Sequence, residues 1–316
     1  MTRNLPRRSF LQSLAALGLP LGLTKLDPDR GPAGMAFPAP APPPAAGPRR
    51  GFLKAAGLGM VQEGEDLKAR FQLLAELGYD GVEMNSPNDH PLEEVLAAKE
   101  ASGLEIHAVV DSVHWQKPFS APDEETVKAA TAGLERALRD AKAYGADQVL
   151  LVPAVVNRQV SYRQAWERSQ ANIAPLLPLA RELGVGIAIE NVWNGFLLSP
   201  LEFAAYIDAF DDPIVGAYLD VGNMVRFGWP THWIEALGTR IRKVHVKGYS
   251  RKLMNDSGPW SGFGTGIHDG DCEWPAVLAA LQEVGYDGWF TAEVGGGGRE
   301  RLAAVAADLD RIMRGE

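Results

Sequence analysis

The sequence contains a single cysteine, Cys272, among 316 residues. One thiol excludes an internal disulfide and a zinc site built from several cysteines. Because no cysteine lies near the N-terminus, we expect no lipoprotein-type membrane anchor. Basic residues are also few, since 31 lysines and arginines against 40 acidic residues leave a formal charge of −9. An acidic protein gains nothing from counterion release, so nucleic acid is not an expected partner.

Long apolar runs are missing as well. The apolar segment that ends at Leu23 is too short and too interrupted to span a bilayer. It follows the paired Arg7 and Arg8 of RRSFL, and a Pro/Ala/Gly-rich stretch comes after it. This order is typical of a twin-arginine export signal and a linker, with a disordered basic tail as the alternative. We therefore expect residues 1–50 to be signal and linker, residues 51–316 to be the folded domain, and the protein to be periplasmic or extracellular.

From Phe52 onward, short apolar runs alternate with segments of helical period. The expected strands are 52–60, 81–84, 105–110, 148–153, 186–190, 215–220, 242–247 and 289–294. Expected helices between and after them include 65–78, 123–145, 161–184, 199–210, 274–285 and 299–313. Strict alternation implies a parallel sheet, and eight strand–helix units predict a single-domain (β/α)8 TIM barrel. An open doubly wound sheet is the alternative, but AAGLGM at 55–60 lacks the G-x-G-x-x-G spacing.

Four metal-ligating side chains stand at the expected ends of the last four strands. They are Glu190, Asp220, His245 and Glu293. Chemistry in such a barrel sits at the carboxyl ends of the strands, and consecutive strands aim these side chains at one point. Three carboxylates and one imidazole suit one divalent ion such as Mn²⁺, Mg²⁺ or Co²⁺. Each residue alone is compatible with a salt bridge, but the set predicts a metal site.

Further polar and aromatic residues are expected near this point. His114 and Trp115 follow the third strand, Glu83 lies in the second, and Lys247 follows the seventh. We expect these four to contact the substrate. The alternatives are a hydrogen-bonded loop histidine, a charge-neutralising lysine and a Glu83 that contacts the partners of the metal ligands instead. Tryptophans, including Trp115, Trp193 and Trp260, can stack on the apolar face of a ligand ring or serve as packing.

The motifs GYDGVEM, IENVWN, YLDVGN, VHVKGYS and GYDGWFTAEV resemble the xylose-isomerase-like TIM-barrel superfamily of sugar phosphate isomerases and epimerases. The resemblance extends from Phe52 to Met313. It implies that the four strand-end residues hold one divalent metal ion and that Glu190 and Glu293 exchange protons with the substrate. It also implies that Arg251 contacts the substrate.

Several positions depart from the pattern of many relatives. Asn223 stands where a histidine touches the substrate, and Gly248 follows Lys247 where relatives have an aspartate. Phe196 replaces a further glutamate of the epimerases, and IHDGD replaces the common G-E-G-D loop. These departures argue against a standard ketose-epimerase pocket, while Asn223 remains an expected substrate contact.

The sequence therefore favours a metal-dependent sugar isomerase or epimerase that acts through an enediolate. An unphosphorylated sugar or keto-sugar is expected, because an exported enzyme meets few sugar phosphates and no basic phosphate cradle is visible. The alternative is a lyase that cleaves 3-keto-glycosides by β-elimination in the same site. A non-catalytic sugar-binding barrel and an endonuclease-type relative are less favoured, and a homo-oligomer is compatible with the sequence.

Replacement of both arginines of the expected signal by lysine, Arg7→Lys with Arg8→Lys, should leave the folded protein in the cytoplasm. The twin-arginine route reads the arginine pair itself rather than its charge. Cell fractionation and immunoblotting measure the outcome, and Arg3→Lys serves as the control. Export of the double variant at the parental level would contradict the export signal.

Overall fold

The computed structural model describes residues 51–316, so the expected signal and linker lie outside the described residues. Eight parallel strands form a closed barrel in sequence order, and β1 pairs with β8. The strands are β1 (Leu53–Gly57), β2 (Gly81–Ser86), β3 (Glu105–Asp111), β4 (Gln148–Leu151), β5 (Gly186–Glu190), β6 (Val215–Asp220), β7 (Ile241–Val246) and β8 (Trp289–Ala292). This confirms the predicted single-domain (β/α)8 barrel and excludes the open sheet.

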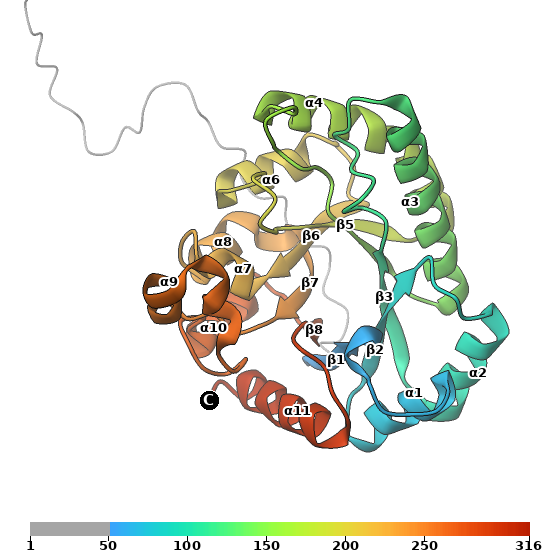
Figure 1. Cartoon of the computed structure of the whole chain (residues 1–316), viewed down its shortest axis with the longest axis vertical. Helices are drawn as coiled ribbons and strands as arrows, with labels where there is room; N and C mark the ends of the chain where they lie inside the picture. The colour runs from blue at the N-terminus through green and yellow to red at the C-terminus, as the bar shows by residue number, and fades with distance from the viewer. Residues whose placement is uncertain (1–50) are drawn as a thin grey trace, which may run out of the picture. The chain divides into compact units, whose positions relative to one another are not determined.

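Helices surround the ring of strands, as Figure 1 shows. They are α1 (Leu67–Glu76), α2 (Leu92–Ser102), α3 (Glu124–Tyr144), α4 (Tyr162–Ile173), α5 (Leu177–Leu183), α6 (Pro200–Asp208), α7 (Val221–Val225), α8 (Pro230–Leu237), α9 (Arg251–Ser257), α10 (Trp274–Glu283) and α11 (Arg299–Met313). The secondary structure of residues 51–316 also includes four short 3-10 segments: η1 (Leu58–Met60), η2 (Ala174–Leu176), η3 (Gly238–Arg240) and η4 (Pro259–Gly264). No helix of this part of the chain has the length and apolarity needed to cross a membrane.

The described residues hold more helices than the eight predicted. The single helix expected over 161–184 divides into α4, η2 and α5, because Pro175 and Pro178 lack the backbone N–H that a continuous helix needs. The short helices α7 and α9 lie in the connections that follow β6 and β7. These connections lie at the carboxyl ends of the strands, where the predicted site residues gather.

Local signals place α3 where the sequence predicts it. The Asp123 side chain accepts a hydrogen bond from the Thr126 backbone N–H, and Glu124 and Glu125 occupy the first turn. Gly145 ends the helix with a φ of 83°, a conformation that glycine adopts without steric cost. The ends of α3 are therefore fixed by a capping aspartate, Asp123, and a C-terminal glycine, Gly145.

Apolar side chains pack in two separate places. The large core lies between the strands and the helices, and a small cluster of Ala108, Leu150, Ala188 and Tyr218 occupies the barrel interior. Buried polar groups fill the rest of the interior, including Glu83, His107 and Thr291. Buried polar groups need partners, so the barrel interior carries a hydrogen-bond network beneath its carboxyl end.

Candidate metal centre

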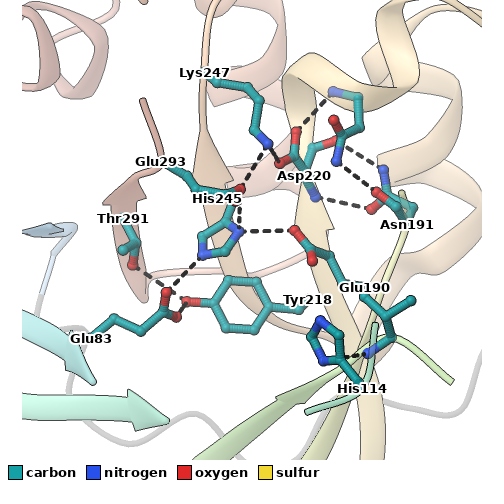
Figure 2. A network of polar contacts seen from close by, with 12 residues as sticks. Glu83, His114, Glu190, Asn191, Tyr218, Asp220, His245, Lys247, Thr291 and Glu293 are labelled. Atoms are coloured by element: carbon teal, nitrogen blue, oxygen red, sulfur yellow. Dashed lines mark hydrogen bonds and ion pairs between the residues drawn. The ribbon is translucent and has the colours of Figure 1, made fainter. Parts of the chain in front are cut away.

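The four predicted metal ligands meet at the carboxyl end of the barrel. Glu190 and Asp220 are the last residues of β5 and β6. His245 lies one residue before the end of β7, and Glu293 follows β8 directly. One possible ligand atom from each side chain lies within 4.8 Å of the others, and Figure 2 shows the side chains converging. This confirms the predicted convergence and fits a divalent cation.

Asp220 supplies a direct test of that fit. The side chain is fully buried, and Oδ1 accepts a 2.8 Å hydrogen bond from the Asn223 backbone N–H. Oδ2 makes no hydrogen bond, and the Lys247 ammonium 2.8 Å away is its one ion-pair partner among the described residues. A buried carboxylate oxygen with so little compensation is costly. A cation bound in the cluster would satisfy it.

The His245 imidazole lies between carboxylates on both sides. Nδ1 is 2.9 Å from Glu190 Oε1 and 3.0 Å from Glu293 Oε2, while Nε2 is 3.1 Å from Glu83 Oε2. Burial lowers the pKa of His245, but the charges of Glu83 and Glu293 outweigh burial and raise it well above its usual value. Nδ1 faces the other ligands and would bind the metal ion. Glu83 would then hold the Nε2–H and orient the ring.

The carboxyl groups of the cluster differ in pKa because their neighbours differ. Burial and the charge of Glu293 raise the pKa of Glu190 to about 7. Burial raises the pKa of Asp220 to about 6, although Lys247 opposes it. Burial also acts on Glu293, but Lys247 and His245 outweigh it and hold the pKa of Glu293 well below its usual value. Cation binding would therefore displace protons from the cluster.

Two asparagines join the ends of β5 and β6. The Asn191 side chain donates to the Asp220 carbonyl and accepts from the Asp220 backbone N–H, both at 2.9 Å. Asn223 Nδ2 donates to the Asn191 carbonyl at 2.9 Å. Asn223 lines the cavity as expected, but its amide is already bonded to the Asn191 backbone and stabilises the strand ends. Asn191 was not predicted as a site residue, although it directly follows Glu190 in the sequence.

A polar layer lies one step deeper in the barrel. Tyr218 Oη donates a 2.5 Å hydrogen bond to Glu83 Oε1 and lies 3.4 Å from Thr291 Oγ1. Thr291 Oγ1 lies 3.1 Å from His107 Nε2. Tyr218 and Thr291 each precede a ligand by two positions. Because side chains two residues apart on a strand share a face, this spacing could have located them from the sequence.

His114 offers a neutral hydrogen-bond donor to the cavity. Nδ1 accepts a 3.3 Å hydrogen bond from the Val152 backbone N–H. Burial lowers the pKa of His114 to about 4, although Glu293 opposes it. The ring proton therefore resides on Nε2, so His114 suits a substrate-contacting donor better than a base.

A cavity of about 900 Å³ lies over the cluster. It is lined by five of the side chains predicted to contact substrate, namely Glu83, His114, Trp115, Asn223 and Lys247. Arg251 is not among the lining residues. Its guanidinium donates to the Gly228 carbonyl at 2.6 Å and lies over the Trp229 ring. This conformation gives no support to Arg251 as a substrate contact, and Phe196 is buried in the core.

Purified protein is expected to hold one divalent ion per chain, and Asp220→Asn is expected to lose it. The change removes the charge of a fully buried ligand, so affinity should fall by at least about a hundredfold, the upper range for loss of an outer partner. Elemental analysis measures occupancy, and thermal unfolding with and without chelator measures the linked stability. The exposed Asp269→Asn is the control. Full occupancy in the Asp220 variant would contradict the site.

Glu83→Gln is expected to weaken metal binding roughly 10- to 100-fold without removing a ligand. The amide oxygen can still accept from Tyr218, but the carboxylate that faces His245 Nε2 is lost. Competition with a chelator of known affinity measures the change. Glu105→Gln, an exposed residue at the start of β3, is the matched control. Equal affinities of the two variants would show that Glu83 does not orient the histidine.

Comparisons with known proteins agree with this architecture. Residues 71–314 match the family described as xylose isomerase-like TIM barrel. The chain is 23% identical over 240 residues to inosose dehydratase of Bacillus thuringiensis (strain Al Hakam), a match that covers 70% of this chain and 79% of that protein.

Two solved structures share the fold at low sequence identity. A D-tagatose 3-epimerase-like protein superimposes with a TM-score of 0.70 and 19% identity, covering 83% of this chain and 97% of that one. D-allulose 3-epimerase from Methylomonas sp., in complex with D-allulose, gives a TM-score of 0.67 and 17% identity over 83% and 96%. Since the family match spans most of the barrel, the chain belongs to the xylose isomerase-like TIM barrel family.

Proposed function

We propose that the protein is a divalent-metal-dependent isomerase or epimerase of an unphosphorylated sugar or keto-sugar. The observation that carries the proposal is the convergence of Glu190, Asp220, His245 and Glu293 within 4.8 Å at the catalytic end of the barrel. The similar proteins include an inosose dehydratase and sugar 3-epimerases. Removal of a proton from the carbon beside a carbonyl is a first step that epimerisation and dehydration of keto-sugars can share.

A bound divalent ion would polarise the substrate carbonyl and ease removal of the neighbouring proton. The proton passes from carbon to a carboxylate, and the C–H electron pair moves into the carbon skeleton to give an enediolate. Glu293 pairs with Lys247 and its side chain is 48% exposed in the cavity wall, so it can reach the substrate as one proton-transfer group. Glu190 ends β5 and lines the same cavity, so it can serve as the other. His114 Nε2–H can donate a hydrogen bond to a substrate oxygen.

The charge of the cavity wall supports an unphosphorylated substrate. Lys247 and Arg301 are the basic side chains among its lining residues. The Lys247 ammonium is already paired with Asp220 and Glu293, at 2.8 and 2.7 Å. Three glutamates line the same cavity. The Arg301 guanidinium donates to the Gly295 carbonyl. Both basic side chains therefore already have partners, so the wall offers a phosphate group no dedicated basic cradle, whereas sugar hydroxyls would find donors and acceptors.

A lyase acting on 3-keto-glycosides is the second candidate. The similarity to a dehydratase favours it, because elimination starts with the same proton transfer. The electron pair then expels a β-oxygen, which leaves with a proton as water or as an alcohol. A non-catalytic barrel is disfavoured by the intact set of four ligands. Export through residues 1–50 remains part of the proposal, because it would bring the enzyme to unphosphorylated sugars.

Glu190→Gln and Glu293→Gln should each slow catalysis at least about a hundredfold, the lower range for acid–base catalysis. Glutamine keeps the shape and one oxygen but cannot accept the proton. Solvent deuterium incorporation into a panel of ketoses and 3-keto-glycosides, followed by NMR, measures proton transfer directly.

Metal occupancy must be measured in each variant, since both residues are also candidate ligands. The exposed Glu235→Gln on α8 is the control. If metal-loaded Glu293→Gln incorporates deuterium at the parental rate, Glu293 serves only as a metal ligand and not as a proton-transfer group. A metal-loaded parent that exchanges no substrate of the panel would overturn the proposed reaction.

A further inference from the structure

An aromatic wall of Trp193, Trp260 and Phe263 borders the cavity beside the metal cluster. The Trp193 ring centroid lies 4.7 Å from that of Trp260 and 4.9 Å from that of Phe263. Trp260 is 71% exposed. Large aromatic side chains gathered and exposed at a cavity mouth mark a binding surface more often than a packing defect.

The wall is held in a fixed relation to the cluster. Trp193 Nε1 donates a 2.8 Å hydrogen bond to the carbonyl of Asn223, whose backbone N–H bonds to Asp220. Lys247 Nζ lies 5.7 Å from the Phe263 ring centroid and contacts the Asp220 carboxylate. A ligand held at the cluster can therefore extend directly onto these rings.

The cavity has room for more than one sugar ring. Its volume of about 900 Å³ lies near the top of the roughly 300–1,000 Å³ range of pockets that enclose drug-sized ligands. One monosaccharide at the cluster leaves most of this space, including the aromatic wall, unfilled. The wall itself presents aromatic faces, and the Arg226 guanidinium lies over the Trp193 ring at 4.7 Å. An uncharged ring with an apolar face is the chemistry that such a surface recognises.

We propose that the wall of Trp193, Trp260 and Phe263 binds a second ring of the substrate, so that the natural substrate class is a glycoside rather than a free sugar. This inference rests on the proposed function, in which the first ring occupies the cluster. The second ring is either another sugar or an aromatic aglycone, since both offer an apolar face. Trp260 is the exposed ring on which it stacks, and Trp193 and Phe263 pack beside that indole.

Calorimetric titration of the metal-loaded protein tests the wall with ligands that are not turned over. Methyl β-glucoside, phenyl β-glucoside and methyl β-cellobioside have no free carbonyl group, and the last two carry a second ring. The parent should bind at least one two-ring ligand about tenfold more tightly than the methyl glucoside. Trp260→Ala should lose about two- to tenfold of this preference, the range of a stacking contact. Because the Trp260 side chain is highly exposed, its replacement by alanine should not prevent folding.

Trp229→Ala is the matched control, because Trp229 is 53% exposed but does not line the cavity. Tighter binding of phenyl glucoside alone would identify an aromatic aglycone, and tighter binding of methyl β-cellobioside would identify a sugar; either supports the wall. Equal affinity of the parent for all three ligands, or equal losses in both tryptophan variants, would overturn it. Deuterium exchange is measured separately. A protein that exchanges ketoses but shows no preference for two-ring ligands would contradict the aromatic wall and leave the proposed reaction standing.

Discussion

The buried His245 imidazole, placed between carboxylates from three other strands, is the interaction on which the rest of the site depends. Glu190 and Glu293 approach one ring nitrogen and Glu83 approaches the other. Carboxylates buried this close repel one another unless protons or cations lie between them. Without a metal ion, the His245 imidazole, whose pKa is raised, and the Lys247 ammonium lie between the carboxylates. A bound divalent ion would supply positive charge at the same place.

The polar contacts that balance these charges continue into the barrel interior. Glu83 can face His245 only because Tyr218 satisfies its other oxygen, and Thr291 continues the contacts to His107. The interior therefore holds polar groups where an apolar core would pack more simply. Above this layer, Asn191 and Asn223 fix the backbone at the ends of β5 and β6. The ligands are thus positioned by neighbours from below and from the side, as precise ligand geometry requires.

The cluster and its surroundings have different roles in the proposed function. The proposed proton transfer beside a carbonyl depends on the cluster and its two glutamates, Glu190 and Glu293. Substrate choice would depend on residues around the cluster. Two positions expected to matter there do not reach the cavity: Phe196 is buried in the core, and the Arg251 guanidinium donates to the Gly228 carbonyl. Exposed aromatic side chains and glutamates line the cavity around the cluster, and the proposed neutral, two-ring substrate rests on these residues.

The sequence by itself determined the barrel, because the alternation of apolar runs and helical periods leaves few other topologies. It also predicted the four residues of the cluster, because each stands at the end of one of four successive strands. The break at Pro175 and Pro178 follows from local chemistry that the sequence already contains. Only the tertiary structure decided that Glu83 contacts His245 and that Arg251 does not line the cavity. Residues 162 positions apart in the chain meet there, and which distant side chains meet depends on strand register and loop path, which composition and spacing do not encode.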